Sequence, residues 1–153
     1  MITENKLDKS FGSTGTTAGI FLLIIGVITT FTSLFGLVLV LLGAFLGFSS
    51  TSALIDFDKR RIKYSNNLFG VIKTGKWIQL TAIMKLAIRD SAITWRTYSR
   101  GNRALDFVDK DFRIILLDLD NQEIMQVKKT DTLDLAKTEL EILCTKLKLN
   151  AVE

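Results

Sequence analysis

The sequence predicts a helical hairpin that crosses a membrane, followed by a mostly-β domain of about seven antiparallel strands with a C-terminal capping helix. Three observations support this prediction. The stretch from Ser10 to Ile55 contains no Asp, Glu, Lys, Arg or His. After it, apolar and polar residues alternate with a period of two, as they do in half-buried strands. The last segment returns to apolar steps of three and four, which indicates an amphipathic helix.

The uncharged stretch is the right length for two crossings joined by a tight turn, because one helical crossing takes about 20 apolar residues. We assign the hairpin to residues 13–51, with helices at Thr16–Thr30 and Leu34–Ser50 and a turn at Phe31-Thr32-Ser33. A buried hairpin in a soluble protein is the alternative, but a chain of 153 residues offers too little protein to surround it. A signal peptide would have a shorter apolar region and no second apolar segment directly after it.

Glycines recur at helical spacing along both expected helices. Small residues at such spacing let helix backbones approach closely in a membrane. Two interpretations stay open: the glycines pack the two helices on each other, or they form a face for self-association or a partner. Neither helix contains an ionisable group, which argues against an ion path, a proton relay or a transport site. The six glycines are Gly15, Gly19, Gly26, Gly36, Gly43 and Gly47.

The composition argues against catalysis and metal binding. The chain has no His and a single Cys, Cys144. Zinc sites of the Cys/His type and Ser-His-Asp or Cys-His centres are therefore excluded within one chain. No glycine loop of the phosphate-binding kind occurs either. We expect no enzyme activity, no cofactor and no metal, and we expect Cys144 to be a core or boundary residue of the last helix.

Charge is distributed unevenly along the segment that follows the hairpin. Between Lys59 and Arg103, Asp90 is the only acidic residue among eleven basic ones, whereas the segment from Ala104 onwards is mildly acidic. This asymmetry predicts contact with an anionic surface. Basic residues close to the second helix also predict, by the positive-inside rule, that this end of the hairpin lies in the cytoplasm. Two crossings then place the N-terminal tail, residues 1–12, on the same side.

Two groups of basic residues are candidate binding sites. The first would bind lipid head groups, or serve only as a topology signal on a solvated strand face. The second would bind a phosphate group or an acidic partner, or form a charged outer face. Nucleic acid is not an expected partner, because membrane tethering disfavours it. The first group is Lys59, Arg60, Arg61 and Lys63, and the second is Arg89, Arg96, Arg100 and Arg103.

The remaining elements follow from local patterns. Met1–Lys9 is polar, and we expect a frayed or interfacial tail. Ser65-Asn66-Asn67 and Asp109-Lys110-Asp111 indicate turns or loops. The final helix is expected at residues 131–148, capped by Thr130 or Asp131, with an apolar stripe along one face. Strands are expected near residues 53–57, 61–64, 68–74, 84–89, 93–98, 112–119 and 123–129, and residues 77–80 are expected to form a short connection or a further strand.

Short antiparallel strands followed by one amphipathic helix resemble the pleckstrin-homology-type (PH-like) fold, a bent sheet or partly open barrel closed by that helix. A membrane hairpin leading into such a domain is similar to bacterial membrane-anchored PH-like proteins. The resemblance rests on Ala53–Asp58, Gly75–Ile78, Phe112–Glu123 and the final helix. In lipid-binding members, basic residues around the first β-hairpin grip phosphoinositide phosphates, and here Lys59, Arg60, Arg61 and Lys63 occupy that place.

The resemblance implies a bacterial inner-membrane protein with both termini and a PH-like domain, residues 52–153, in the cytoplasm. Its expected partners are membrane phospholipid and other membrane-protein subunits, and a homo-oligomer is possible. The expected function is that of a non-enzymatic accessory, scaffold or assembly subunit of a larger membrane complex. The alternative is a module that binds anionic lipid and senses the state of the membrane.

Overall fold

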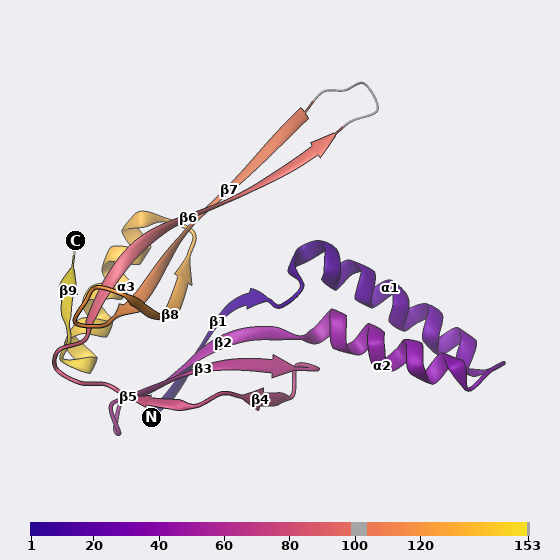
Figure 1. The fold of residues 1–153 in the computed structure, drawn as a ribbon, viewed down its shortest axis with the longest axis horizontal. Coiled ribbons are helices and arrows are strands. Elements are labelled where there is room, and N and C mark those ends of the chain that lie inside the picture. The colour runs from indigo at the N-terminus through magenta and orange to yellow at the C-terminus, as the bar shows by residue number, and fades with distance from the viewer. Residues whose placement is uncertain (99–103, 153) are drawn as a thin grey trace. The chain divides into compact units, whose positions relative to one another are not determined.

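The computed structural model describes the backbone of residues 1–98 and 104–152, and the side chains of these residues except 92–110 (Figure 1). The described chain contains an N-terminal apolar helix, then a mostly-β region with two sheets, and a C-terminal helix, as the sequence predicts. It divides into two compact units, Met1–Gln79 and Leu80–Glu153. A single domain over residues 52–153 was expected, whereas the first sheet belongs to the same unit as the helical hairpin.

The expected N-terminal tail is a strand. β1 (Ile2–Lys9) pairs antiparallel with β2 (Ser50–Asp56), and Ile2 lies opposite Asp56. A frayed or interfacial tail was expected, whereas the segment is a paired strand. The sequence carries no strand signal here because Leu7 is the only buried residue of β1, so the segment shows no apolar alternation. Beyond the paired strands, the amide of Ser10 donates to the carbonyl of Ser49 at 3.1 Å. The helical hairpin is therefore the connection between two neighbouring strands (Figure 1).

The helical hairpin consists of α1 (Gly12–Thr30) and α2 (Phe35–Phe48). The turn falls at Phe31–Ser33 as predicted, while α2 is shorter than expected because β2 begins at Ser50. Threonine hydroxyls in α1 donate to the carbonyl four residues earlier, as Thr16 does to Gly12 at 2.8 Å and Thr30 does to Gly26 at 2.8 Å. These bonds satisfy the hydroxyls inside an otherwise apolar helix.

The first sheet has the order β1-β2-β3-β4, and β5 also pairs with β3. Its remaining strands are β3 (Arg61–Leu68), β4 (Ile72–Thr74) and β5 (Trp77–Gln79). The turn predicted at Ser65-Asn66-Asn67 is instead part of β3. The polar side chains of Ser65 and Asn67 are buried and hydrogen-bonded to each other at 3.1 Å. The expected strand at 68–74 is interrupted at Phe69-Gly70, where the chain turns from β3 into β4.

The second sheet has the order β8-β7-β6-β9. Its strands are β6 (Lys85–Tyr98), β7 (Ala104–Leu117), β8 (Glu123–Thr130) and β9 (Asn150–Val152). β6 runs through two expected strands, and the loop expected at Asp109-Lys110-Asp111 lies inside β7. The strands were expected to be antiparallel, and none was expected after the final helix. β9 instead follows that helix and pairs parallel with β6.

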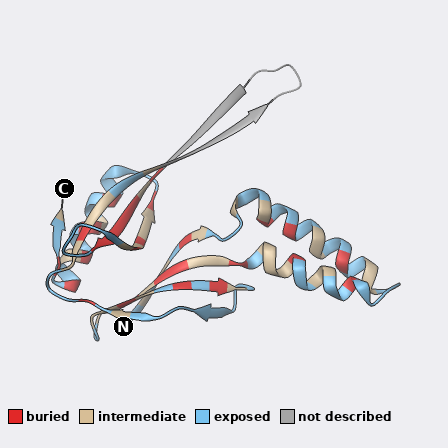
Figure 2. Cartoon of the chain, in the orientation of Figure 1, coloured by how far each residue is buried: buried red, intermediate tan, exposed pale blue. Residues whose placement is uncertain are grey.

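α3 (Leu133–Leu147) packs against the strands of the second sheet. Its N-cap is Thr132, whose hydroxyl accepts from the Leu135 amide at 3.4 Å, so the caps expected at Thr130 and Asp131 were one or two residues early. The predicted stripe is buried at Ala136, Leu140, Leu143 and Leu147 (Figure 2), while Leu133 is 40% exposed. Lys148 then adopts a left-handed conformation, φ 54°, which reverses the chain into β9.

Replacing Thr132 by Ala removes the cap of α3. We expect a loss of about 1 kcal/mol in the free energy of unfolding, because the Leu135 amide loses its partner. Urea unfolding of the full chain in detergent, followed by tryptophan fluorescence, measures the change. Thr138→Ala is the matched control, since its hydroxyl bonds only to the Asp134 carbonyl within the helix and Ala is the better helix former. Equal losses for the two variants would contradict the assigned cap.

Candidate functional site

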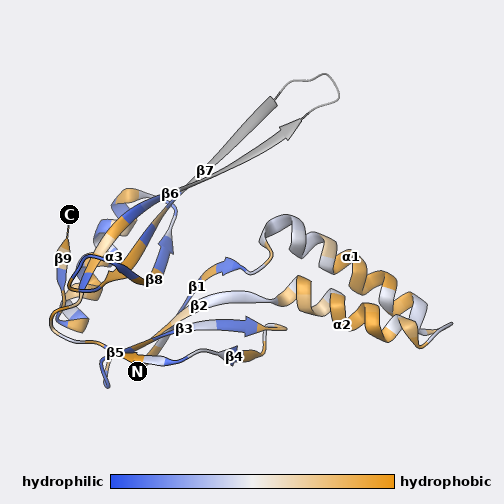
Figure 3. Cartoon of the chain, viewed as in Figure 1, coloured by the Kyte–Doolittle hydropathy of each residue, from blue (hydrophilic) through white to orange (hydrophobic). Residues whose placement is uncertain are grey.

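The most distinctive surface of the described chain is the outside of the helical hairpin. The buried residues of the two helices are small: Thr16, Gly19 and Gly26 in α1, and Gly36 and Gly43 in α2. Most of the large apolar residues of both helices are exposed. Figure 3 shows that both helices are hydrophobic along most of their length, and Figure 2 shows few buried residues on them. This arrangement, with small residues buried and large apolar residues exposed, is the reverse of that in a water-soluble protein, which buries its large apolar residues. The exposed set is Ile20, Phe21, Ile24, Ile25, Val27, Ile28, Phe31, Leu34, Phe35, Leu37, Val38, Leu41, Leu42 and Phe48.

Four of the six predicted glycines lie where the backbones of α1 and α2 meet. A Cβ on Gly19 would lie 2.5 Å from the backbone nitrogen of Gly47, and one on Gly26 would lie 2.6 Å from that of Val40. Added Cβ atoms on Gly36 and Gly43 would collide with backbone atoms of Thr30 and Leu23. Any larger residue at these positions would force the helices apart.

The other two glycines are different. An added Cβ on Gly15 would meet Phe11, a neighbour within one helical turn, at 2.6 Å. One on Gly47 would find only ordinary contacts with Ile20 at 3.6 Å. Of the two interpretations, packing of the helices on each other therefore accounts for the positions of Gly19, Gly26, Gly36 and Gly43.

An aromatic cluster lies at the base of the hairpin, where the helices enter the first sheet. The rings of Phe11 and Phe45 lie 5.3 Å apart edge to face, and those of Phe45 and Phe69 lie 5.4 Å apart. Phe69 belongs to the turn between β3 and β4, and its amide donates to the hydroxyl of Ser49 at 3.3 Å. Sequence reasoning missed this cluster, because nothing in the sequence indicates that β3 returns to the helices.

The first basic group lies at the opposite end of the first sheet. Ser50 pairs with Asn67 beside the helices, whereas Asp56 pairs with Arg61 six residues further along β2. At about 3.3 Å per residue, this end lies roughly 20 Å from the base of the hairpin. Arg61 bonds to the Asp56 carboxylate at 3.0 Å and lies 4.4 Å from the Trp77 ring centre.

The other three basic residues of this group lie at the same end of the sheet, two in the β2–β3 turn and one within β3. Lys59 and Arg60 form the β2–β3 turn, in which the Lys59 amide donates to Asp56 at 3.3 Å. Lys63 is half-buried within β3, opposite Leu54. Burial of the Asp56 carboxyl would raise its pKa, but the hydrogen bonds from Arg61 and the Lys59 amide outweigh this effect and lower the pKa. Arg61 thus has a structural partner, and Lys59, Arg60, Arg61 and Lys63 lie within one end of the sheet.

The second basic group is described only in part. Arg89 forms an ion pair with Glu123, which joins β6 to the start of β8. Arg96 lies in β6 with its backbone opposite Asp106, and its side chain is outside the described part. Arg100 and Arg103 lie outside the described residues. A phosphate site formed by Arg89, Arg96, Arg100 and Arg103 therefore stays a prediction.

A polar network crosses one face of the first sheet. The Asn67 amide donates to Ser52 at 3.0 Å, and its nitrogen lies 3.5 Å from Glu4 on β1. Lys73 on β4 completes the row with an ion pair to Glu4 at 2.5 Å. The hydrogen bond from Lys73 is the main reason that the pKa of Glu4 is lowered. Since each contact joins different strands, the network fixes β1 and β4 to the centre of the sheet.

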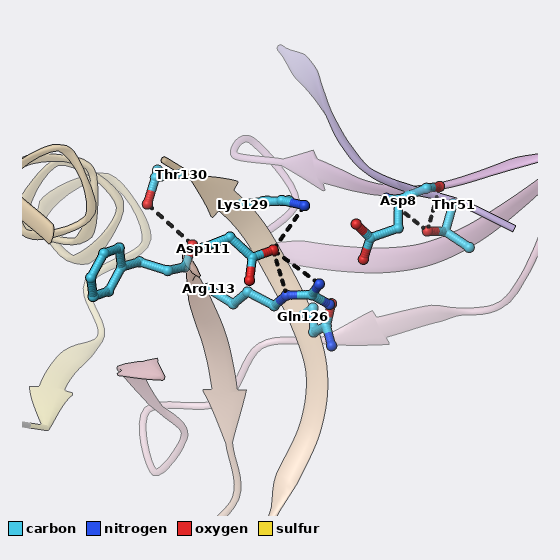
Figure 4. A network of polar contacts seen from close by, with 8 residues as sticks. Asp8, Thr51, Asp111, Arg113, Gln126, Lys129 and Thr130 are labelled. Carbon is cyan, nitrogen blue, oxygen red and sulfur yellow. Dashed lines mark hydrogen bonds and ion pairs between the residues drawn. The ribbon is translucent and has the colours of Figure 1, made fainter. Parts of the chain in front are cut away.

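A second polar cluster lies in the other unit, around Asp111 on β7 (Figure 4). The carboxylate of Asp111 is 4% exposed and accepts from Arg113 at 3.0 Å and from Lys129 at 2.8 Å. Arg113 also donates to the Gln126 side chain at 2.8 Å. Burial would raise the pKa of Asp111, but the hydrogen bonds from Lys129 and Arg113 outweigh it, so the pKa is lowered.

Three further features of the described residues concern metal binding, the single cysteine and a cavity. No group of three or more His, Cys, Asp or Glu residues in the described part could hold a metal ion. Cys144 is half-buried in α3, and burial raises the pKa of its thiol, which disfavours the reactive thiolate. A cavity of about 540 Å³ is lined by residues of α3, β6 and β9, both apolar ones such as Ile88 and Leu140 and charged ones such as Asp90 and Lys137.

Comparison with protein-family models, curated proteins and solved structures gave no match to this chain. The function must therefore be argued from the geometry. The outward-facing apolar surface of the hairpin and the aromatic cluster at its base are the features that most require a partner.

The Asp111 cluster predicts how stability depends on pH. A carboxyl whose pKa is lowered in the folded state stabilises the protein above its ordinary pKa, here 3.8, and this stabilisation is lost as pH falls through the folded-state pKa. We expect Asp111→Asn to cost about 3 kcal/mol at pH 7, because Arg113 and Lys129 lose a buried partner. The difference from the unmodified chain should shrink below about pH 4.

Urea unfolding of the full chain in detergent at several pH values measures this difference. Glu141→Gln is the matched control, because Glu141 is exposed and lies outside the cluster. A cost of Asp111→Asn that stays constant down to pH 2 would contradict the role assigned to the carboxylate.

Proposed function

We propose that this chain is a non-enzymatic integral membrane protein, anchored by the α1–α2 hairpin, that serves as an accessory, scaffold or assembly subunit of a larger membrane complex. The observation that supports the anchor is the reversed packing of the hairpin, with glycines inside and large apolar residues outside. In water, each exposed Leu, Ile or Phe side chain would cost about 1.5–3 kcal/mol relative to burial. In a bilayer, lipid chains cover the same side chains.

The dimensions of the helices agree with this proposal. Within the described residues, α1 is the helix that is long and apolar enough to cross a membrane. Its 19 residues extend about 28 Å, close to the roughly 30 Å of a bilayer core. α2 has 14 residues, or about 21 Å, so the segments on either side of it must complete the second crossing.

The pairing of β1 with β2 supports the proposed topology. Because the Ser10 amide bonds to the Ser49 carbonyl, a hairpin that crosses the bilayer twice would begin and end on one side. The basic residues that follow favour the cytoplasmic side, and we propose a bacterial inner-membrane location with both termini inside. The turn at Phe31–Ser33 would then face the opposite side, and no large segment would be exposed there.

Two sheets followed by a helix support a distant relation to the PH-like fold, which remains part of the proposal. The chain departs from that plan in three ways. β1 precedes the membrane hairpin, β9 follows the helix, and β6 and β9 are parallel. We propose that these β units provide the surface that binds other membrane-protein subunits. Sensing of anionic lipid is the second candidate, and its candidate residues at the distal end of the first sheet are Lys59, Arg60, Arg61 and Lys63.

Placing a charge on the outer surface of the hairpin tests the anchor. Leu41 lies near the middle of α2 and is 62% exposed. We expect Leu41→Asp to weaken insertion by about 3 kcal/mol, because a carboxylate at the centre of a crossing helix is costly. Carbonate extraction of membranes should retain the unmodified chain and release a larger fraction of the variant.

Leu119→Asp is the control, because Leu119 is 59% exposed but lies after β7, outside the hairpin. It should be retained like the unmodified chain. Release of the unmodified chain by carbonate would overturn the membrane assignment. Equal retention of all three proteins would contradict the placement of Leu41 in the bilayer core.

The subunit role predicts a stable complex. After extraction with a mild detergent, we expect the tagged chain to elute with a second protein in a fixed ratio, at a mass well above that of a 17.1 kDa monomer. A tag at the C-terminus is appropriate, since the N-terminal amine forms an ion pair with Asp58. A monomer without a partner would overturn the subunit role, and a mass that is a multiple of 17.1 kDa without a second protein would indicate self-assembly.

A further inference from the structure

We propose that the turn between β3 and β4, together with Ile72 at the start of β4 (residues 69–72), is a second membrane-binding element that inserts into the phospholipid interface beside the base of the hairpin. We call these residues the interfacial turn. This inference rests on the proposed membrane anchor. It adds a surface to that anchor and names its partner as the head-group and upper acyl-chain region of the same bilayer.

The first argument is position. β3 returns to the helices with Asn67 opposite Ser50, and the next residues form the turn. The Phe69 amide donates to the Ser49 hydroxyl, directly after α2. A Cβ on Gly70 would lie 3.4 Å from the carbonyl oxygen of Phe48, the last residue of α2. The interfacial turn therefore packs against the end of the membrane helix.

The second argument is exposure. Val71 is 79% exposed, Ile72 is 55% exposed and Phe69 is 38% exposed, although all three are large and apolar. Their neighbours at the hairpin base, Phe11 and Phe48, are 40% and 53% exposed. A turn in water normally carries Asn, Asp, Gly or Ser. Because this apolar surface continues that of the hairpin, the bilayer that covers the helices would cover the turn as well.

The third argument is backbone conformation. Phe69 and Gly70 both have positive φ, 55° and 70°, as in the tight turns that favour Asn-Gly. A bulky residue such as Phe is rarely found in this region, because its Cβ is crowded there. The strain places the Phe69 ring 5.4 Å from that of Phe45. An aromatic ring at a strained position, in a cluster that reaches the helix, favours a binding role for this turn.

The fourth argument is length. The 14 residues of α2 extend about 21 Å, which is less than the roughly 30 Å of the hydrocarbon core. A short crossing segment draws its flanking residues toward the lipid. At the sheet end of α2, those residues are Ser49 and, beside it, the interfacial turn.

The charges nearby suit an interface rather than the membrane interior. Lys73 directly follows the interfacial turn. Lys9, the last residue of β1, lies opposite Ser50 at the end of the sheet that is next to the helices. At this depth the Lys9 side chain would extend its ammonium group toward phosphate head groups. The ammonium group of Lys73 instead pairs with Glu4 of the same sheet.

An environment-sensitive fluorophore on a single cysteine tests the proposal in the full chain. The background is Cys144→Ser, and the labelled positions are Val71→Cys in the turn, Leu41→Cys in α2 and Lys59→Cys at the distal end of the sheet. The proteins are placed in vesicles of phosphatidylethanolamine and phosphatidylglycerol that contain lipids with a quencher at a shallow or a deep position. We expect the label at position 71 to emit as in a lipid environment and to respond most to the shallow quencher.

The two controls separate this proposal from the anchor. We expect the label at position 41 to respond to the deep quencher and the label at position 59 to emit as in water. A water-like label at position 71 with a lipid-like label at position 41 would overturn the interfacial turn and leave the anchor intact. Water-like emission from both positions would overturn both proposals.

Phe69→Asn tests whether the apolar side chains hold the turn in the interface. Asn tolerates a positive φ, so the turn and the fold are expected to persist, as the circular dichroism spectrum would check. Combined with Ile72→Ser, we expect this change to move the label at position 71 toward water-like emission and reduce shallow quenching at least twofold. Unchanged quenching in a folded double variant would overturn the proposal.

Discussion

The close approach of the α1 and α2 backbones is the constraint on which the rest of the structure depends. It occurs at Gly19, Gly26, Gly36 and Gly43, where no side chain separates the helices. Because small residues occupy the contact, the large apolar residues must face outward, which makes the hairpin suitable for lipid and unsuitable for water. The same approach brings the two ends of the hairpin to adjacent positions, so that β1 and β2 are able to pair.

The first sheet and the hairpin therefore form one structural unit. β1 leads into α1, α2 leads into β2, and the Phe11–Phe45–Phe69 cluster packs at the junction. The polar row from Glu4 through Asn67 to Lys73 then fixes the outer strands to the inner ones. The second sheet is stabilised differently, by packing against the apolar stripe of α3 and by the buried ion pairs of Asp111.

Patterns that are local in sequence predicted local structure well. The absence of charge between Ser10 and Ile55 indicated the helical hairpin, and the stripe of α3 followed from its spacing. What could not be predicted depends on contacts between distant residues. Leu7 alone does not indicate a strand. Ser65 and Asn67 read as turn residues in the sequence, because their place in a strand depends on contacts with Ser52 and Glu4 from other strands. The aromatic cluster at the candidate site was missed for the same reason.

The pairing of β1 with β2 has a consequence for synthesis of the protein. Ile2–Lys9 are synthesised before both helices, but the strand that they pair with follows both helices. The first strand must therefore wait, unpaired, until the hairpin has been made, and closing the sheet then joins segments about forty residues apart in one step. If the helices enter the bilayer as proposed, the first sheet closes only after they have been made, so a chain whose helices fail to insert would also lack a folded first sheet.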